Sequence, residues 1–331
     1  MLTNSKCLVT GGAGFIGSNL IEVFLKADNQ VVCLDDLSTG KKENISEFLS
    51  NKNFTFIEGD IRNLDICKKA CDGVEFVFHH AALGSVPRSI KNPIATSEVN
   101  IMGFLNILTA ARDAKVKRFI YASSSSVYGD DETLPKIETR IGKPLSPYAI
   151  TKRSNELFAE NFSRLYGMET IGLRYFNVFG KKQDPNGAYA AVIPKFISAL
   201  IKRESPLIYG DGTISRDFTY IDNVVFANQL AALVSLSSLT TISHQLSTIF
   251  NIACGQSTSI NELFTLIRGE LSKHDIRIAS IDPIYGAPRH GEILHSNADI
   301  SKAHQFFGYS PQLSLLEGLR ETISYYWNVA K

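Results

Sequence analysis

The chain has 331 residues, of which 34 are basic and 33 acidic, and its formal net charge is +1. This length supplies one large or two moderate domains with an ample core, and the balanced charge argues against a nucleic-acid partner or electrostatic binding to a membrane. Five cysteines without disulfide or zinc spacing, no signal-peptide pattern and no bilayer-length apolar run predict a cytoplasmic protein with reduced thiols and no metal site.

The first predicted strand ends in a glycine-rich turn. An apolar run leads into Thr10–Gly17, and the residues that follow have the apolar spacing of a helix. The turn satisfies two overlapping dinucleotide-binding patterns, Gly12-x-Gly14-x-x-Gly17 and Gly11-x-x-Gly14-x-x-Gly17. Glycine suits this turn because a pyrophosphate can then approach the backbone at the helix N-terminus. The residues expected to contact the cofactor here are Gly11, Gly14, Phe15, Ile16 and Gly17.

The second predicted strand ends in an acid. Asp35 follows the apolar run Val31–Leu34, eighteen residues after Gly17, where a carboxylate accepts hydrogen bonds from the adenosine ribose. Because this carboxylate would repel a 2′-phosphate, the pattern favours NAD over NADP. A glycine turn and a helix-capping acid in an unrelated α/β protein are the alternative. Further along the chain, the residues expected at the cofactor are Asp36, Ser38, Thr39, Gly40, Asp60, Ile61, Ala81 and Ala82.

Strands and helices alternate through the first half of the sequence. After the two strands already described, strands are predicted at 54–60, 74–82, 117–122 and 170–176. Long helices are predicted at 94–114 and 148–165, and a shorter one between Lys41 and Ser50. This alternation is typical of an α/β fold with a doubly wound parallel Rossmann sheet, here of six strands.

The sequence after residue 176 is less regular. Glycine and proline recur there, as in loops that shape a binding site. We expect residues 1–176 to form an NAD-binding Rossmann domain and residues 177–331 a smaller C-terminal substrate-binding lobe, with 218–253 packing back on the Rossmann domain. Within this second half, residues 250–253 predict a short strand and residues 236–248 a surface loop.

Tyr148 and Lys152 lie four residues apart at the start of a predicted helix, and therefore on one face of it. A phenol with a pKa near 10 is a poor base at neutral pH. An ammonium group roughly 4 Å away, at an effective dielectric near 20, would favour the phenolate by about 4 kcal/mol, or roughly three pKa units. The serine run 123–126 ends the fifth strand, where a hydroxyl can share a substrate hydroxyl with Tyr148. An amphipathic helix with a snorkelling lysine is the alternative.

Several segments together resemble one enzyme family. They are Thr10–Gly17, Ser123–Gly129, Tyr148–Lys152, Arg174–Gly180 and Ser215–Phe218. Over nearly its whole length the sequence resembles the extended short-chain dehydrogenases/reductases, the family of nucleotide-sugar epimerases and dehydratases. The resemblance implies that Tyr148 is the catalytic base and that Lys152 holds the nicotinamide ribose and lowers the Tyr148 pKa. It also implies an assisting serine, Ser124 or, as the near alternative, Ser125.

The resemblance implies a UDP-sugar as substrate. Its nucleotide and diphosphate contacts fall on Asn177, Arg216 and Arg289, with Glu292 toward the ribose. Segments 82–89 and 184–194 resemble UDP-N-acetylglucosamine 4-epimerases of the bacterial polysaccharide type. The other residues expected at the substrate are Ser85, Arg88, Ser124, Ser125, Ser126, Ala191, Val192, Lys195 and Ser296.

The residues after Ser124 favour epimerisation over the other reactions of the family. Dehydratases carry an acid and base pair there and UDP-glucuronate decarboxylases an acid, whereas this sequence has Ser125 and Ser126. Ordinary UDP-galactose 4-epimerases have a tyrosine at the position of Ser296, so the serine leaves space for an N-acetyl group. Leu207 departs from close relatives, which place an aromatic residue there against uracil.

The implied reaction is reversible 4-epimerisation of a UDP-N-acetylhexosamine, with UDP-glucose and UDP-galactose as further candidates. Tyr148 removes the proton of the carbon-4 hydroxyl as NAD accepts the hydride, and the 4-keto sugar turns before the hydride returns. NAD is therefore expected to stay bound through turnover. The alternatives are a 4-epimerase of a UDP-uronic acid and a catalytically silent NAD-binding regulator. The resemblance also implies a homodimer formed by helices 94–114 and 148–165.

Overall fold

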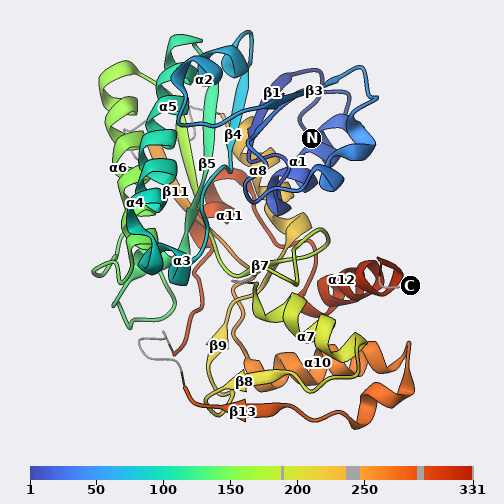
Figure 1. The fold of residues 1–331 in the computed structure, drawn as a ribbon. Helices are drawn as coiled ribbons and strands as arrows, with labels where there is room; N and C mark the ends of the chain where they lie inside the picture. Colours follow the sequence, from blue (N-terminus) through green and yellow to red (C-terminus); the bar gives the residue numbers. More distant parts are fainter. Residues whose placement is uncertain (188–189, 236–246, 289–293, 330–331) are drawn as a thin grey trace.

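A parallel β-sheet forms the larger half of the protein. The computed structural model describes residues 1–187, 190–235, 247–288 and 294–329, and within them this sheet has seven strands in the order β11-β6-β5-β4-β1-β2-β3 (Figure 1). The strands are β1 (Lys6–Thr10), β2 (Gln30–Asp35), β3 (Phe54–Glu58), β4 (Phe76–His79), β5 (Arg118–Ser124), β6 (Thr170–Tyr175) and β11 (Ser247–Ile252). Because the order runs outward from β1 in both directions, it confirms the doubly wound Rossmann sheet.

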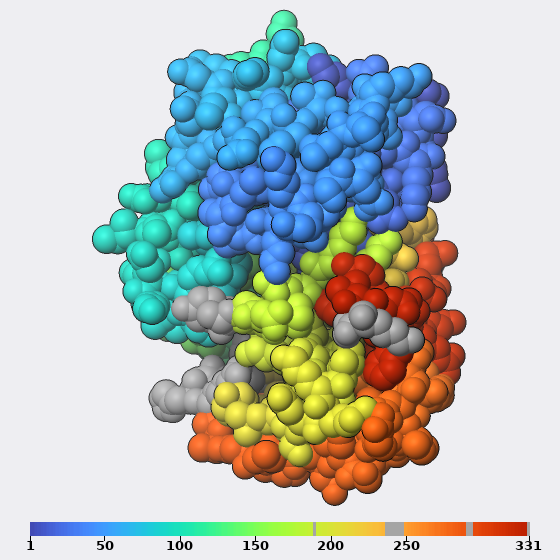
Figure 2. Space-filling model, turned by 45° about the vertical axis from the view of Figure 1, so that its right-hand side comes forward, coloured from blue at the N-terminus to red at the C-terminus, as the bar shows by residue number. Residues whose placement is uncertain are grey.

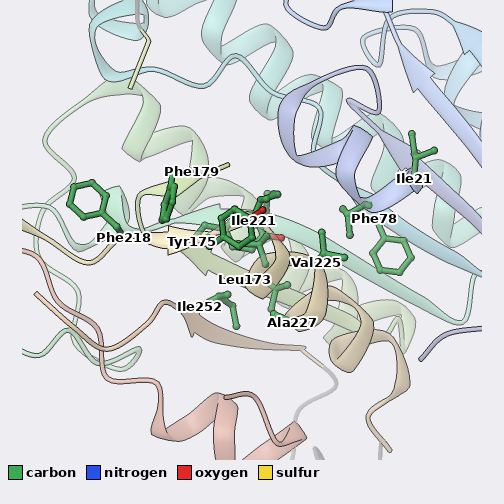
Figure 3. Packing of buried hydrophobic residues seen from close by; sticks show 14 of the residues in the cluster. Ile21, Phe78, Leu173, Tyr175, Phe179, Phe218, Ile221, Val225, Ala227 and Ile252 are labelled. Atoms are coloured by element: carbon green, nitrogen blue, oxygen red, sulfur yellow. The ribbon is translucent and has the colours of Figure 1, made fainter. Parts of the chain in front are cut away.

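Helices cover both faces of this sheet (Figure 1). They are α1 (Phe15–Lys26), α2 (Leu64–Cys71), α3 (Val86–Lys91), α4 (Pro93–Ser97), α5 (Phe104–Asp113), α6 (Pro147–Tyr166) and α8 (Ile221–Leu233). Neighbouring residues of a strand point to opposite faces, so Leu8 of β1 packs in the layer of Ile107 from α5. The other layer contains Ile21 of α1, Phe78 of β4 and Val225 of α8, as Figure 3 shows. The strands are therefore buried on both faces, as their apolar runs predict.

The seventh strand comes from the second half of the sequence. β11 pairs in parallel with β6, with Ile252 opposite Tyr175. The prediction of a six-stranded sheet is therefore wrong, and the strand expected at 250–253 lies in the sheet instead of the C-terminal lobe. This placement agrees with the expectation that residues 218–253 pack back on the Rossmann domain. The physical reason is that Phe250 and Ile252 are fully buried in the core beside the sheet. Residues 236–246 of the expected surface loop lie outside the described residues, and its last two residues belong to β11.

Two predicted helices differ from the observed elements. The segment between Lys41 and Ser50 forms two short 3-10 helices, Lys42–Asn44 and Ser46–Phe48, and Asn44 Nδ2 donates a 2.8 Å hydrogen bond to the Ala13 carbonyl. The expected helix 94–114 is divided into α4, a π-helical segment at Glu98–Gly103 and α5. Such segments are frequent at functional sites. Here the buried Asn100 Oδ1 accepts a 2.8 Å hydrogen bond from the Leu83 N–H.

Shorter elements make up the C-terminal lobe, which Figure 2 shows in yellow and orange beneath the blue and cyan Rossmann half. They are β7 (Val178–Phe179), α7 (Val192–Ile201), β8 (Leu207–Tyr209), β9 (Ser215–Arg216), β10 (Thr219–Tyr220), β12 (Thr258–Ser259), α10 (Ile260–Ser272), a 3-10 helix at Ile276–Ser280, β13 (Ile284–Gly286) and α12 (Leu315–Val329). Helix α11 (Ser301–Phe307) packs instead on β11 of the Rossmann sheet, where Phe307 contacts Phe250. Helices α7 and α10 pack through Phe196 and Phe264, whose ring centroids lie 6.1 Å apart. The division at residue 176 stays a prediction.

One helical stretch is long and apolar enough to cross a bilayer, by length and composition alone. It is Pro93–Asp113, of which the most apolar window is 44% buried inside the protein. The expectation that no run reaches this length needs this correction. Phe104, Ile107 and Leu108 of the stretch pack in the core against the sheet. Core packing therefore accounts for much of its apolar character.

Candidate active site

The carboxyl ends of the strands open into a cleft of about 600 Å³. The parallel register places Thr10 beside Leu34 and His79, and Ser124 beside Tyr175, so these strand ends meet at one edge of the sheet. Of the residues predicted from the sequence, those that line the cleft are Gly11, Gly14, Phe15, Ile16, Gly17, Asp35, Asp36, Ser38, Thr39, Asp60, Ile61, Ala81, Ala82, Arg88, Ser124, Ser125, Tyr148, Lys152, Asn177 and Ala191. Most residues expected at the cofactor and all three expected in catalysis thus surround one space.

The glycine turn is too tightly packed for side chains at two positions. Gly11 has a φ of +67°, and a Cβ there would lie 2.7 Å from the Ala81 nitrogen. A Cβ on Gly17 would lie 2.3 Å from the Gly11 carbonyl oxygen. Gly14 is the N-cap residue of α1 and has no side chain to cap the helix. The N-terminus of α1 is therefore available to an anion in the cleft.

We expect Gly17→Ala to lower the free energy of unfolding by about 1–3 kcal/mol, because the added methyl group forces the backbone of the turn to shift. NAD binding should weaken as well, since that shift moves the helix N-terminus. Urea denaturation and fluorescence titration with NAD measure the two effects. The control is Gly269→Ala in α10, where a Cβ meets nothing within 4 Å and alanine is the better helix former. Equal unfolding free energies for the two variants would contradict the prediction.

Asp35 is held by backbone groups at the end of β2. Its Oδ2 accepts a 2.9 Å hydrogen bond from the Ala13 N–H and its Oδ1 a 2.8 Å bond from the Leu37 N–H. Burial raises the pKa of Asp35, while these two hydrogen bonds lower it. Gly40 packs against this carboxylate instead of lining the cleft, because a Cβ on Gly40 would lie 2.7 Å from Asp35 Oδ1. Gly40 thus leaves room for the Asp35 carboxylate, and its own contact with the cofactor stays a prediction.

Tyr148 and Lys152 both face the cleft from the first turns of α6. Lys152 Nζ lies 5.9 Å from the centroid of the Tyr148 ring and donates a 2.7 Å hydrogen bond to the Ala122 carbonyl. Burial lowers the pKa of Lys152 to about 8, against the attraction of the Glu156 carboxylate. Burial raises the pKa of Tyr148, and a hydrogen bond with the Ser124 side chain lowers it.

The pKa of Tyr148 is thus shifted in the direction opposite to the one expected from the sequence. The loss of water around the phenol raises its pKa, and the Lys152 ammonium donates its hydrogen bond to a carbonyl at the end of β5. Ser124 supplies the interaction that favours the phenolate. This geometry supports Ser124 over Ser125 as the assisting serine.

The four serines at the end of β5 and directly after it, at positions 123–126, have different environments. Ser123 lines the cleft, and its Oγ donates a 2.6 Å hydrogen bond to Glu156 Oε1. Ser124 and Ser125 line the cleft. Ser126 does not line it, and its buried hydroxyl has no hydrogen-bond partner among the described residues. The Ser126 N–H donates a 3.2 Å hydrogen bond to Ser124 Oγ. The Ser126 backbone therefore contacts Ser124, and the substrate contact expected of the Ser126 side chain stays a prediction.

Three other residues predicted at the substrate lie beside the cleft without lining it. Ser85 caps α3, since its Oγ accepts a 3.2 Å hydrogen bond from the Arg88 N–H. Val192 and Lys195 lie in the first turn of α7, directly after Ala191, which lines the cleft. Their contact with substrate stays a prediction.

Arg216 and Ser296 both donate a hydrogen bond to the Ser215 carbonyl. Arg216 Nη1 donates to this oxygen at 2.9 Å and the Ser296 N–H at 3.1 Å. Neither residue lines the cleft, and both stay predicted substrate ligands. Arg289 and Glu292 lie outside the described residues.

The cleft also contains residues that the sequence analysis does not assign to it. His80 lines the cleft, and its Nε2 lies 3.0 Å from the Tyr175 hydroxyl, with the two rings stacked. Burial lowers the pKa of His80 to about 3, so the imidazole is neutral. Gln183 and Asp184 line the side of the C-terminal lobe. The sequence could have indicated Tyr175 and Asp184 as cleft residues, because they lie in segments 174–180 and 184–194, which resemble the family.

Comparison with known protein families classifies the chain. Residues 7–252 match the NAD dependent epimerase/dehydratase family. The chain belongs to this family. Its cofactor is accordingly NAD, and the enzyme class and the resemblance to extended short-chain dehydrogenases/reductases are confirmed.

Relatives in this epimerase family extend over the whole chain. The putative UDP-glucose 4-epimerase of Methanocaldococcus jannaschii is 38% identical over 323 residues, which are 97% of this chain and 98% of that protein. The structure of UDP-N-acetylglucosamine 4-epimerase from Methanobrevibacter ruminantium M1, in complex with UDP-N-acetylmuramic acid, is 40% identical, has a TM-score of 0.89 and covers 99% of this chain and 100% of its own. UDP-glucuronic acid 4-epimerase from Bacillus cereus, in complex with UDP-glucuronic acid and NAD, is 33% identical, with a TM-score of 0.85 and coverage of 98% and 99%.

The residues of the cleft fit the NAD cofactor of the family. The turn at Gly11 and Gly17 leaves a cradle that a Cβ would fill, next to the N-terminus of α1. Asp35 is fixed by two backbone N–H groups and lines the same cleft, as a ribose ligand should. Lys152 and Tyr148 line it as well.

Proposed function

We propose that the chain catalyses the reversible 4-epimerisation of UDP-N-acetylhexosamines, with UDP-hexoses as poorer substrates. The observation that carries the proposal is the arrangement of Tyr148, Ser124 and Lys152 in the cleft, with serines instead of acids at positions 125 and 126. This set can remove and return a proton, but it supplies no acid for eliminating water. Relatives named as UDP-sugar 4-epimerases, at 33% to 40% identity, support the proposal.

Tyr148 is the base in the proposed reaction. NAD, held by the glycine turn, Asp35 and Lys152, supplies when bound a group that accepts a hydride and gives it back. Tyr148 takes the proton of the carbon-4 hydroxyl, and the Ser124 hydroxyl shares a hydrogen bond with the same oxygen. After the 4-keto sugar has turned its other face to the same groups, Tyr148 returns the proton. The UDP must stay anchored while the sugar turns.

The preference for an N-acetyl group rests on Ser296, which stands where UDP-galactose 4-epimerases have a tyrosine. A smaller side chain at this wall leaves room for the acetamido group. The relative from Methanobrevibacter ruminantium, named as a UDP-N-acetylglucosamine 4-epimerase, supports this choice. A UDP-uronic acid is the second candidate because Arg88 lines the cleft, where its guanidinium can bind a carboxylate with two hydrogen bonds.

A panel of UDP-sugars tests the proposal. The purified protein is incubated, without added NAD, with UDP-N-acetylglucosamine, UDP-glucose, UDP-glucuronate and their carbon-4 epimers, and the products are separated by chromatography. We expect the fastest exchange with the N-acetylated pair. Faster exchange with the uronic acids would instead identify the second candidate, and no exchange with any sugar would exclude an epimerase of this panel.

We expect Ser296→Tyr to reduce kcat/KM for UDP-N-acetylglucosamine by about tenfold or more while sparing UDP-glucose, because a bulky group in a pocket discriminates by this order. The ratio of the two kcat/KM values measures the effect. Ser301→Tyr at the exposed start of α11 is the control and should leave the ratio unchanged. An unchanged ratio in the Ser296 variant would remove Ser296 from the substrate wall.

We further propose a homodimer formed by residues 94–114 and α6. The two segments pack on each other and leave large apolar side chains exposed, namely Ile94, Met102, Ile150 and Leu157. An exposed apolar patch of this kind marks an interaction surface. Light scattering should give the mass of a dimer, and Ile94→Lys should shift it toward the monomer. A monomeric mass for the unaltered chain would overturn the proposal.

A further inference from the structure

A continuous series of buried hydrogen bonds leads away from the catalytic helix. It starts at Glu156, one turn after Lys152 on α6, whose carboxylate accepts from Arg174 Nε at 2.8 Å and Nη2 at 2.9 Å. Arg174 Nη1 also donates to the Tyr128 hydroxyl at 3.1 Å. That hydroxyl donates to Asn251 Oδ1 at 2.6 Å. Each of the four side chains that form this series is at most 2% exposed.

Asn251 connects this series to the segment that contains Ser296. Asn251 Nδ2 donates to the Lys136 carbonyl at 2.9 Å and to the Asp299 carbonyl at 3.0 Å. The backbone of Lys136 also pairs directly with residues 297–299. The Lys136 N–H donates to the Asn297 carbonyl at 2.8 Å, and the Asp299 N–H donates to the Lys136 carbonyl at 3.0 Å. Ser296 directly precedes this pairing. A buried path of polar groups thus joins the helix of Tyr148 and Lys152 to the segment of Ser296, the predicted wall of the sugar site.

We propose that Tyr128 and Asn251 are positioning residues that fix the Ser296 segment relative to the catalytic helix. The inference rests on the proposed function for the role of Ser296, and it extends that function to residues outside the cleft. Neither Tyr128 nor Asn251 lines the cleft, so neither is a ligand of the substrate there. The Tyr128 hydroxyl accepts a hydrogen bond from Arg174 and donates one to Asn251. The path therefore requires at this position a group that is both a donor and an acceptor.

The position of this wall matters because the sugar must meet Tyr148 with either of its two faces. A displacement of about 1 Å from the reactive arrangement can reduce a rate by about 10²-fold. The Ser296 segment also holds Arg216, whose Nη1 donates to the carbonyls of Ser215 at 2.9 Å and Leu294 at 3.2 Å. A shift of the segment therefore changes both the sugar wall and the predicted diphosphate ligand, and affects binding of the UDP portion as well.

A second buried tyrosine, Tyr121, provides a control that distinguishes the positioning role of Tyr128 from the general effect of losing a buried hydroxyl. Tyr121 on β5 is fully buried like Tyr128, but its hydroxyl has no hydrogen-bond partner among the described residues. Tyr121→Phe therefore removes a buried phenol oxygen without interrupting the path. Tyr128→Phe keeps the ring and removes the hydroxyl that accepts from Arg174 Nη1 and donates to Asn251 Oδ1.

The experiment compares Tyr128→Phe with Tyr121→Phe at a temperature where circular dichroism shows both to be folded. We expect Tyr128→Phe to raise KM for the preferred UDP-sugar and Kd for UDP by about tenfold, the effect of one buried polar group left unpaired. The Kd for NAD should change less than twofold, because the NAD residues belong to the other half of the cleft. Tyr121→Phe should change none of the three values. Unchanged KM and Kd in Tyr128→Phe, or equal changes in both variants, would overturn the proposal.

A second substitution tests the same path from its other end. Arg174→Lys keeps a positive charge beside Glu156 but removes the planar group that reaches Tyr128. Its rise in UDP Kd should not add to that of Tyr128→Phe in the double variant, because both interrupt one connection. Additive effects would contradict a shared path. If the unaltered enzyme converts no UDP-sugar, the proposed function fails, whereas the Kd values for UDP and NAD still decide the positioning role.

Discussion

Replacing Tyr148 with phenylalanine is expected to abolish epimerisation and to leave the protein folded. The substitution removes only the hydroxyl that the proposed reaction uses as its base, and a general base contributes about 10²–10⁴-fold to a rate. We therefore expect kcat on the preferred UDP-sugar to fall by that factor. The Kd for UDP, measured by calorimetry, should stay within about twofold, because the nucleotide contacts predicted from the sequence lie elsewhere.

Tyr166→Phe is the matched control for this variant. Tyr166 ends the same helix, more than half exposed and far along α6 from the cleft. Its kcat should equal that of the unaltered chain. A Tyr148→Phe variant that keeps a tenth or more of the activity would remove Tyr148 from the role of base. If the variant also kept the full cellular effect of the protein, the NAD-binding regulator would replace the enzyme as the explanation.

The largest expected effect on stability follows from Arg174→Met. The variant leaves the Glu156 carboxylate buried without its main partner, and breaking a buried ion pair in this way costs about 3–5 kcal/mol. Arg174 holds the pKa of Glu156 below its ordinary value in the folded protein, despite burial. The pair therefore stabilises the fold fully above the ordinary pKa of glutamate, and this contribution is lost as the pH falls through the lowered one. Urea denaturation at neutral and acid pH measures both effects.

Arg153→Met provides the control for the buried pair. Arg153 Nη1 donates to the same carboxylate at 2.9 Å, but its side chain is 36% exposed. A partly exposed pair contributes about 0–1 kcal/mol. We therefore expect Arg153→Met to be much less destabilising than Arg174→Met. Equal losses would show that burial of Arg174 is not what makes its pairing important.

The parts of the fold that depend on local pattern can be predicted from the sequence. The apolar runs and helical spacing give the order of strands and helices, because each element shows its own periodicity. The glycine turn and Asp35 give the cofactor end of the cleft, since their roles depend on backbone space and on the end of a strand. The segment at 250–253 is recognisable as a strand, but its place in the sheet is not, because the pairing partner is decided by packing across the whole domain.

Side-chain environments within the site are the parts that sequence reasoning misses. The spacing of Tyr148 and Lys152 predicts proximity, but the direction of the Tyr148 pKa depends on how completely α6 and β5 exclude water from the phenol. The position of Ser126 in the serine run predicts a substrate contact, whereas the short helix after β5 turns its hydroxyl into the interior. Tyr128 and Asn251 are far apart in sequence, and only the folded chain brings them together.

The placement of β11 beside β6 has a consequence for dividing the chain. A fragment that stops near residue 176 would contain every residue expected to bind NAD, yet it would lack the strand that covers the outer edge of β6. That edge would then present unpaired N–H and C=O groups along its length, which is a template for association with other chains. The two halves are therefore joined by shared backbone pairing, and expression of the NAD-binding half alone should give aggregated material.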